Sequence, residues 1–329
     1  MTGSLASAQI GVVVIGRNEG ERLHLCLRSL KTLTNHLVYV DSGSTDNSVA
    51  WAKSHEITVV ALDMCLPFTA ARARNAGFRQ LLRAAPHISM VQFVDGDCEL
   101  DANWLTVAAT YLANHLDVVC VCGRLRERFP ERSVYNRLCD IEWDRAAGAT
   151  DACGGVAMMR TEAFERAGLF EESLTAGEEP ELCIRMRAQG GSIWRLSANM
   201  ALHDADMHRF DQWWRRTMRG GYVVAEGFAL YGTAPTTRYS SKLSKIIFWS
   251  FAVPLAIITL AVGDPRWLVL TAIYPLQIFR LARRGDVKKI FTWRIALFQV
   301  MANFSEAVGV GKYLSNRIRK SSGGLIEYR

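Results

Sequence analysis

Short apolar runs alternate with segments of helical periodicity along the first hundred residues. The runs IGVVVI, HLVYVD, ITVVAL and SMVQFVD cover residues 10–15, 36–41, 57–62 and 89–95. Continuous apolar runs of this length are typical of strands buried on both faces of a parallel sheet. Helices are predicted between them at 19–33, from 48 onward and at 69–82. This alternation predicts a doubly wound α/β fold.

From residue 100 to 240 the pattern is more mixed, but it still reads as one globular catalytic domain spanning 1–240. Helices are predicted at 102–114, 161–168 and 208–232, the last of them basic and aromatic, and a further helix ends near 145. Strands are predicted at 117–122 and 192–197. No internal repeat or low-complexity linker interrupts this part of the chain.

The remaining residues, 241–329, predict a membrane-associated helical tail. Two uncharged apolar runs, 246–262 and 267–279, flank a Gly-Asp-Pro turn and predict a hairpin over about 246–279. The first run is barely long enough to cross a bilayer, which needs about 20 residues, so crossing and dipping into the membrane both stay open. A third segment, about 290–312, carries Arg294, Asn303 and Glu306 and predicts an interfacial or packed helix. The alternative is a set of buried core helices in a soluble domain.

Charge and composition favour the membrane interpretation. Half of the 329 residues are hydrophobic, the net charge is +7, and the isoelectric point is about 9.1. Many basic residues flank the apolar runs: Lys242, Lys245, Arg280, Arg283, Arg284, Lys288, Lys289, Arg317, Arg319 and Lys320. Such flanking charge is typical of segments on the cytoplasmic side of a membrane and favours a membrane partner over nucleic acid.

The eight cysteines and the N-terminus indicate an intracellular catalytic part. The cysteines form no CxxC pair and no Cys/His ligand pattern in the sequence, and most lie within apolar runs. They therefore predict buried, reduced thiols in a reducing cytoplasm. The first residues, MTGSLASAQ, do not have the basic-then-apolar plan of a secretory signal. We expect the protein at the cytoplasmic face of the inner membrane.

The sequence VDGDC places two carboxylates, Asp95 and Asp97, directly after a predicted strand. Ligands of doubly wound sheets gather at the carboxyl ends of strands, and Asp41 ends another one. Two carboxylates one residue apart can hold a hard divalent cation, which bridges the oxygens of a diphosphate and neutralises its charge on departure. The alternative is an ordinary turn, because Asp and Gly also favour turns.

Two further acidic motifs are candidates. In DSGSTD, Asp41 could accept a hydrogen bond from a base imide, while an Asx turn with Asp46 or Ser48 capping the next helix is an alternative. In AGEEPELC, Glu178 or Glu179 could accept the proton of an attacking hydroxyl. The alternative for this pair is a favourable interaction of first-turn acids with the helix dipole.

Taken in order, these motifs resemble the family-2 glycosyltransferases of GT-A fold, in particular the inverting, membrane-associated bacterial type. The resemblance runs from about Val12 to Tyr231. It rests on VVVIGRNEGERL, DSGSTD, ARARNAG, VDGDC, CGGVAMMRTEAFERAGLF and GEEPELC. No single motif is decisive, but their ordered occurrence at suitable spacing is specific.

The resemblance implies roles for individual residues. Asn18 and Glu19 would lie in the donor pocket, Asp41 would read the nucleotide base, and Arg74 and Asn75 would approach the nucleotide. Asp95 would lie near the ribose and the metal, and Asp97 would be the more direct metal ligand. Glu179 matches the position of the family's catalytic base, usually Asp, although the choice between Glu178 and Glu179 stays open.

Three positions depart from the family pattern or extend it. Gly16 and Arg17 stand where Pro often precedes the first motif's Asn. The segment Gln212–Arg216 keeps Gln and Arg of a QxxRW motif but has Arg216 for the final Trp, which argues against a processive polysaccharide synthase. Arg215 and Arg216 are candidates to hold the leaving diphosphate. His203 is a candidate third metal ligand or an ordinary loop histidine.

The resemblance implies an inverting glycosyltransferase that uses Mg²⁺ or Mn²⁺ and a nucleotide-diphospho-sugar donor. A membrane anchor suits a lipid-linked acceptor, either polyprenyl phosphate or a lipid-linked glycan, in cell-surface polysaccharide synthesis. Two rival hypotheses are a nucleotide-sugar-binding membrane scaffold without turnover and a nucleic-acid-binding protein, which would show salt-sensitive DNA binding.

Overall fold

The computed structural model describes residues 9–234 and 238–319, which fall into two compact units. The first unit lies within Met1–Arg132 and Cys139–Asp206, and the second within Ser133–Leu138 and Met207–Arg329. This division assigns the helix after residue 207 to the second unit. The predicted domain boundary at residue 240, which was drawn from composition, stays a prediction. Lys320, one of the basic residues that flank the tail, lies outside the described residues.

Four parallel strands form one half of the sheet in the first unit. They are β1 (Ile10–Gly16), β2 (Leu37–Asp41), β3 (Thr58–Ala61) and β4 (Met90–Asp95). Strand β1 lies between β2 and β4, with Gly16 opposite Asp41 and Ile15 opposite Asp95. Each predicted apolar run is therefore a strand, and the carboxyl ends of β2 and β4 lie at the same edge of the sheet.

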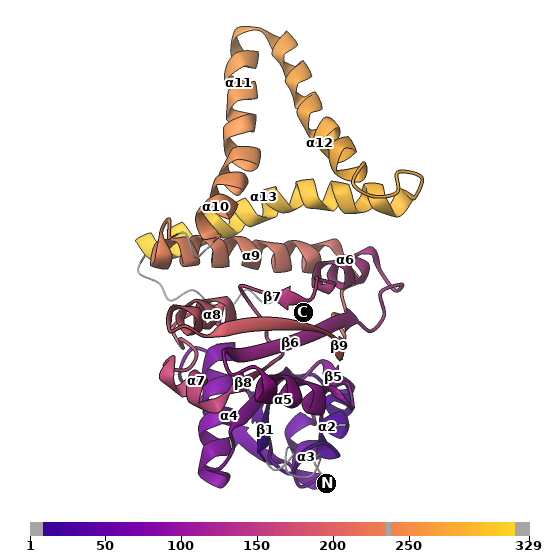
Figure 1. Ribbon diagram of the computed structural model, residues 1–329. Helices are drawn as coiled ribbons and strands as arrows, with labels where there is room; N and C mark the ends of the chain where they lie inside the picture. The colour runs from indigo at the N-terminus through magenta and orange to yellow at the C-terminus, as the bar shows by residue number, and fades with distance from the viewer. Residues whose placement is uncertain (1–8, 235–237, 320–329) are drawn as a thin grey trace. The chain divides into compact units, whose positions relative to one another are not determined.

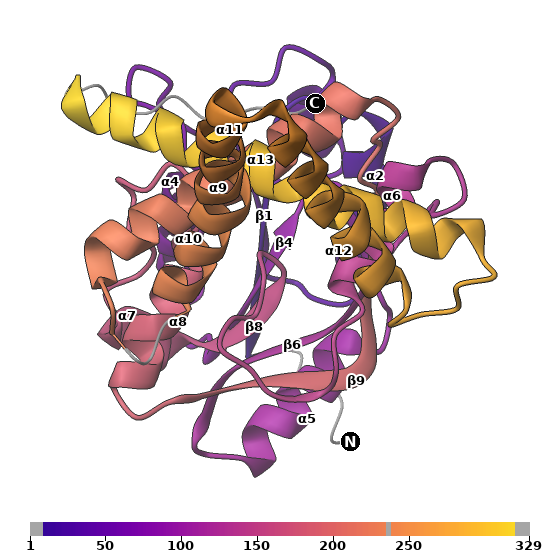
Figure 2. The same cartoon turned by 90° about the horizontal axis from the view of Figure 1, so that it is seen from above.

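The other half of the sheet mixes strand directions. Its strands are β5 (Cys98–Leu100), β6 (Val118–Glu127), β7 (Gly148–Ala149), β8 (Ala157–Arg160) and β9 (Ser192–His203). Strand β8 runs antiparallel to both β4 and β6, while β6 and β9 are parallel. The full order is β3-β2-β1-β4-β8-β6-β9-β5, with β7 paired to β9, and Figure 2 shows β1, β4, β8, β6 and β9 following one another across the sheet. The sheet is thus mixed, and the all-parallel pattern holds for its first four strands.

Helices pack on this sheet through small and aliphatic residues. They are α2 (Glu21–Lys31), α3 (Ser48–Ser54), α4 (Ala70–Ala84), α5 (Trp104–Asn114), α7 (Thr161–Arg166) and α8 (Glu178–Ala188). Helix α6 (Val134–Trp143) is divided between the two units. A Cβ atom at Gly77 of α4 would lie 2.4 Å from Val13 of β1, so glycine lets this helix lie directly on the strand. Helix α2 buries Leu23, Leu27 and Leu30, the helical spacing noted in the sequence.

The second unit is helical. It comprises α9 (Phe210–Tyr231), α10 (Tyr239–Ile247), η1 (Phe248–Ala252), α11 (Val253–Gly263), η2 (Pro265–Ala272), α12 (Ile273–Ala282) and α13 (Ile290–Ile318). Figure 1 shows α11 and α12 as two legs joined at one end, and α13 running along α9. The two apolar runs of the sequence lie in these two legs.

One helix in the described part of the chain is long and apolar enough to cross a bilayer. It is Tyr239–Gly263, in which α10, η1 and α11 run on as 25 residues with a mean hydropathy of 2.3 over its most apolar window. Only 11% of that window is buried within the protein. Large apolar side chains of α11, η2 and α12 are exposed as well. The alternative of buried core helices therefore does not describe this segment.

Candidate active site

The carboxylate at the end of β2 is held in place by its own loop. Asp41 Oδ2 accepts hydrogen bonds from the backbone N–H groups of Gly43 and Ser44, both at 3.0 Å, and Oδ1 accepts one from the Tyr39 hydroxyl at 2.9 Å. Burial beside the Asp41 charge raises the pKa of Tyr39, so this hydroxyl stays a donor. Asp41 is thus buried and fixed at the sheet edge, in a turn that matches its predicted Asx alternative.

The loop after β1 is tied to the loop after β2. Asn18 has a left-handed backbone (φ 55°), and its Oδ1 accepts a hydrogen bond from the Thr45 backbone N–H at 2.7 Å. Asp46 accepts hydrogen bonds from the backbone N–H groups of Gly20 and Ser48. The side chains of Asn18 and Asp46 therefore stabilise the two loops by binding backbone N–H groups. The donor-pocket role of Asn18 stays a prediction.

Glu19 lies between the ends of β1 and β4. Cβ atoms added at Gly16 and Gly96 would each lie 3.3 Å from Glu19 Cγ, and the Glu19 carboxylate pairs with Arg22 at 2.9 Å. The side chain therefore borders the Asp95-Gly96 turn, and its role in a donor pocket stays a prediction.

A buried arginine joins the second and third acidic motifs of the sequence, VDGDC and AGEEPELC. Arg74 of α4 is 3% exposed; its Nη2 donates to Asp95 Oδ1 at 2.7 Å, and its Nη1 donates to Glu178 Oε1. Burial alone lowers the pKa of Arg74, but the charges of Asp95 and Glu178 raise it more, so the guanidinium stays charged. The structure thus brings together Arg74, Asp95 and Glu178.

Gly155 makes room for this ion-pair cluster. A Cβ atom at this position would lie 2.7 Å from Arg74 Nη2 and 2.8 Å from Asp95 Oδ2. The backbone before β8 therefore lies directly against the two charged groups, and a larger residue would push them out of place. This explains the glycine in the CGGVAMMR motif.

Asn75, the neighbour of Arg74, faces away from this cluster. Its amide nitrogen donates to the Phe170 carbonyl and to Glu172, and its Oδ1 accepts from the Phe170 N–H at 3.1 Å. The side chain is buried and anchors the loop before α8. The predicted contact of Asn75 with a nucleotide stays a prediction, and the geometry gives it no support.

Asp97 and His203 meet at the end of β9. His203 Nε2 lies 3.4 Å from Asp97 Oδ2, and the Cys98 thiol donates to Asp97 Oδ1 at 3.4 Å. The ligand atoms of these three residues lie within 4.8 Å of one another. Asp95 does not belong to this group and pairs with Arg74 instead. His203 therefore lies beside one of the two predicted aspartate ligands, and its role as a metal ligand stays a prediction.

Glu127 is the residue behind this cluster that the sequence did not indicate. It ends β6, lies 4.0 Å from His203 Nδ1, and accepts hydrogen bonds from the Phe129 and Ala205 backbone N–H groups. Burial raises its pKa. At 4.0 Å the carboxylate is too far from Nδ1 for a hydrogen bond, so it acts on the imidazole through its charge. The long parallel pairing of β6 with β9 brings Glu127 and His203 opposite each other, which no local motif reveals.

The two adjacent glutamates of α8 point to different partners. Glu178 binds Arg74, whereas Glu179 Oε1 accepts hydrogen bonds from the Cys153 backbone N–H and from the Cys183 thiol. Both are at least nine-tenths buried, so neither carboxylate faces bulk water. The two glutamates therefore differ in environment. Glu178 is paired with a cation, whereas Glu179 accepts hydrogen bonds from neutral donors.

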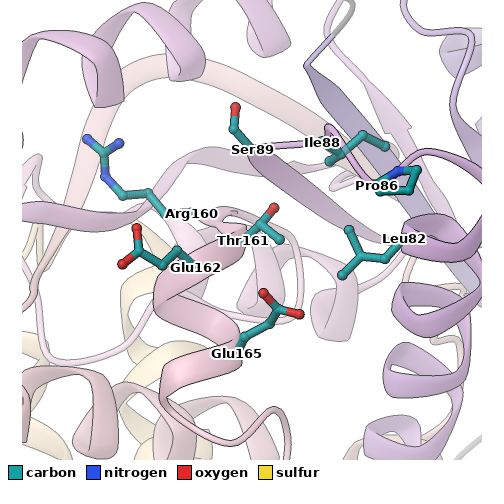
Figure 3. Close-up of a pocket in the computed structure, with 8 residues that line it drawn as sticks. All are labelled: Leu82, Pro86, Ile88, Ser89, Arg160, Thr161, Glu162 and Glu165. Atoms are coloured by element: carbon teal, nitrogen blue, oxygen red, sulfur yellow. The ribbon is translucent and has the colours of Figure 1, made fainter.

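The remaining predicted residues lie elsewhere. Arg215 and Arg216 are on α9 in the second unit, so their role at a diphosphate stays a prediction. The hollow in Figure 3, about 400 Å³, lies at the amino end of β4, where Ser89 precedes the strand and Arg160 donates to the carbonyls of Leu112 and Val118. It is at the opposite end of β4 from Asp95 and is not the predicted donor site.

Known proteins share this architecture. Residues 11–168 match the family model described as Glycosyl transferase family 2. No curated protein sequence matches the chain significantly. Among solved structures, the mannosyltransferase PcManGT from Pyrobaculum calidifontis, in complex with GDP-Man and Mn²⁺, has 18% identity and a TM-score of 0.64, covering 94% of this chain and 88% of that one.

Two weaker structural matches are TarS 1–349 from S. aureus with UDP-GlcNAc and glucosyl-3-phosphoglycerate synthase from Mycobacterium tuberculosis with Mn²⁺ and UDP-Glc. TarS has 16% identity and a TM-score of 0.48, covering 95% of this chain and 92% of that one. The synthase has 19% identity and a TM-score of 0.49, covering 69% and 82%. The family match and the PcManGT match confirm the predicted GT-A fold.

Proposed function

Because residues 11–168 match the family model described as Glycosyl transferase family 2, we propose that the chain is a glycosyltransferase that is inverting, metal-dependent and membrane-attached. In this proposal it moves a sugar from a nucleotide-diphospho-sugar to a lipid-linked acceptor. The observation that carries it is the convergence of Asp41, Arg74, Asp95 and the α8 glutamates around the carboxyl ends of β2 and β4. Ligands of α/β sheets bind at this edge.

The donor and the metal follow from the chemistry of the residues. PcManGT, which shares the fold, was solved with GDP-Man and Mn²⁺, and this supports a nucleotide sugar and a divalent cation here. Asp97 and His203 offer an oxygen and a nitrogen 3.4 Å apart, a separation that two neighbouring ligands of one cation can adopt. A Mg²⁺ or Mn²⁺ ion held there supplies charge neutralisation to a departing diphosphate.

The acid–base role belongs to one of the two α8 glutamates. Arg74 already neutralises Glu178, and this pairing favours a positioning role for Glu178 near the donor. Among the described residues, Glu179 bonds only to neutral donors, and it matches the family position of the base, so we assign it the acceptor proton. A single base and a direct displacement at the anomeric carbon give inversion.

The acceptor is proposed from the second unit. The exposed apolar helix Tyr239–Gly263 suits a bilayer, and basic residues at the feet of the α11–α12 hairpin suit anionic lipid. An enzyme held at the cytoplasmic face of the inner membrane meets polyprenyl phosphate or a lipid-linked glycan by lateral diffusion. This supports a role in cell-surface polysaccharide synthesis.

The deciding experiment is a donor screen with full-length protein purified in detergent. Nucleotide release is measured over a panel of sugar nucleotides with Mg²⁺ or Mn²⁺ and a polyprenyl-phosphate acceptor, and the anomeric configuration of the product is read by NMR. Glu179→Gln should reduce turnover by about 10²- to 10⁴-fold, the usual contribution of a general base, and keep donor affinity. Asp97→Asn should lose metal-dependent turnover.

The exposed Glu162→Gln is the matched control and should retain full activity. Donor binding without nucleotide release from any sugar nucleotide would favour the scaffold hypothesis. A loss confined to Glu178→Gln would move the base to that residue, and a product of retained configuration would exclude the single displacement.

A further inference from the structure

Three buried cysteines surround the carboxylate of Glu179. Cys153 and Cys183 have their sulfur atoms 3.7 Å apart, and the Cys183 thiol lies 3.0 Å from Glu179 Oε1. The thiol of Cys120, on the neighbouring strand β6, lies near that of Cys153. These residues come from a strand, a loop and a helix far apart in the sequence, which is why their spacing showed no ligand pattern.

This arrangement has the dimensions of a site for a thiophilic cation. Zn²⁺ binds cysteine sulfur at about 2.3 Å in tetrahedral geometry, which puts two sulfur ligands about 3.8 Å apart. The observed separation of 3.7 Å matches this, and the ligand atoms of Cys153, Cys183 and Glu179 all lie within 4.8 Å of one another. Two thiolates with a carboxylate form a ligand set that borderline metals such as Zn²⁺ accept.

The same burial disfavours oxidation chemistry at the cluster. The neighbouring Cys120 thiol, together with burial, raises the pKa of Cys153, and burial raises the pKa of Cys183. Buried thiols that stay protonated are poor nucleophiles toward oxidants. A bound cation, in contrast, deprotonates its thiol ligands directly. Metal binding is therefore the chemistry that this cluster favours over disulfide formation.

We propose that Cys153, Cys183 and Glu179 form an inhibitory binding site for Zn²⁺. Binding displaces the protons of the ligating thiols to solvent and transfers no electron. It also occupies the carboxylate of Glu179, so the base can no longer accept the acceptor proton. The inhibitory part rests on the proposed role of Glu179, whereas the binding site itself does not.

The proposed site differs in chemistry from the Asp97–His203 cluster. That cluster offers an oxygen and a nitrogen that suit Mg²⁺ or Mn²⁺, whereas the thiol cluster offers sulfur, which those hard cations bind weakly. The two sites can therefore be loaded with different metals in the same protein. The thiol of Cys98 adjoins Asp97 and could also bind a thiophilic metal, so a Cys98 variant is the matched control.

The binding test uses Co²⁺, whose thiolate complexes have an intense charge-transfer absorption in the near ultraviolet. Full-length protein in detergent, freed of metal by a chelator, is titrated with Co²⁺ and then with Zn²⁺. We expect the band at one Co²⁺ per chain and its loss when Zn²⁺ displaces Co²⁺. It should be retained in Cys98→Ser and Cys139→Ser and lost in Cys153→Ser and Cys183→Ser. Absence of the band from the wild-type protein overturns the site without any variant, and so does its persistence in both Cys153→Ser and Cys183→Ser.

The inhibition test measures transfer in saturating Mn²⁺ with and without one equivalent of Zn²⁺. Transfer should fall about 10²-fold or more, as expected when a general base is removed, and should recover on chelation of Zn²⁺. Cys183→Ser should transfer equally with and without Zn²⁺. A full thiolate band with undiminished transfer overturns the inhibitory role. Protein that shows the band but transfers no sugar even without Zn²⁺ contradicts the proposed function and leaves the binding site standing.

Discussion

At the scale of single residues, burial decides how much each charge near the sheet edge contributes. Arg74 lies deep between two carboxylates, whereas Arg79, one turn farther along α4, pairs with Glu172 at the surface. Surface ion pairs contribute little because solvent screens them. Removing one partner of a buried pair is costly because it leaves the other charge without compensation.

The two arginines therefore give a matched pair of variants. Arg74→Met leaves Asp95 and Glu178 facing each other without a cation, and we expect it to destabilise the first unit by about 3 kcal/mol, the lower end for a broken buried pair because Asp95 is one-third exposed. Arg79→Met should cost about 0–1 kcal/mol. Native-state hydrogen exchange of β4 and α8 measures both free energies of opening. Equal protection in the two variants would contradict the argument.

The sequence identified most of these residues but not their partners. Asp41 and Asp95 were predicted at strand ends because apolar runs stop there, and the structure confirms both positions. The pairing of Arg74 with Glu178 joins positions 104 residues apart, and the Cys153–Cys183 contact depends on where α8 lies. Local periodicity carries no information on such contacts, so the thiols were interpreted only as buried.

At the scale of elements, glycines set how closely two helices of the second unit approach. Helices α9 and α13 cross where a Cβ atom at Gly221 would lie 1.9 Å from the Glu306 carbonyl oxygen, and one at Gly309 would lie 1.9 Å from the Met218 carbonyl oxygen. Both neighbours are backbone atoms, which cannot rotate away. The crossing therefore depends on two positions without side chains.

Gly221→Ala and Gly220→Ala separate this packing from helix propensity. In Gly221→Ala the methyl group meets the backbone of α13, and we expect a destabilisation of about 1–3 kcal/mol, as for overpacking. Gly220→Ala points into open space and should be neutral or stabilising by up to about 1 kcal/mol, because alanine favours helix. Hydrogen exchange of α9 and α13 peptides in detergent reads both effects. Destabilisation by Gly220→Ala as large as that by Gly221→Ala would contradict the crossing.

The elements themselves were predicted where a run was long or strongly periodic. The first four strands and helix α4 lie within two residues of their predicted limits. Strand β8 was missed because four residues after a glycine pair are too short for a pattern, and its antiparallel insertion between β4 and β6 makes the sheet mixed. Strand β9 continues to His203, beyond its predicted end at residue 197, because residues 199–203 pair with β6 and residues 201–203 also pair with β5.

At the scale of the whole molecule, the two compositions seen in the sequence correspond to two kinds of surface. The first unit buries its apolar residues in one core, while the α10–α12 region of the second unit leaves many exposed, among them Phe251, Val262 and Val269. A contiguous apolar surface of this kind in water favours aggregation or a partner. Flanking arginines and lysines are the charge pattern expected if that partner is a lipid bilayer, as proposed above.

Charges placed on α11 test this directly. Leu255 and Ile258 are 50% and 59% exposed in the helix Tyr239–Gly263, so Leu255→Arg with Ile258→Arg disturbs little inside the protein. Each arginine costs about 2.5–3.5 kcal/mol near the middle of a membrane-spanning helix. We therefore expect the double variant to be lost from the membrane fraction that floats in a density gradient. The control Leu116→Arg, at an 82% exposed position of the first unit, should remain in that fraction. Flotation of the double variant at the wild-type level, after a high-salt wash, would show that this helix does not attach the protein to lipid.

Because nucleotide release can be measured in detergent, the same variant also separates attachment from catalysis. It should keep turnover on a detergent-solubilised acceptor and lose it on an acceptor embedded in vesicles.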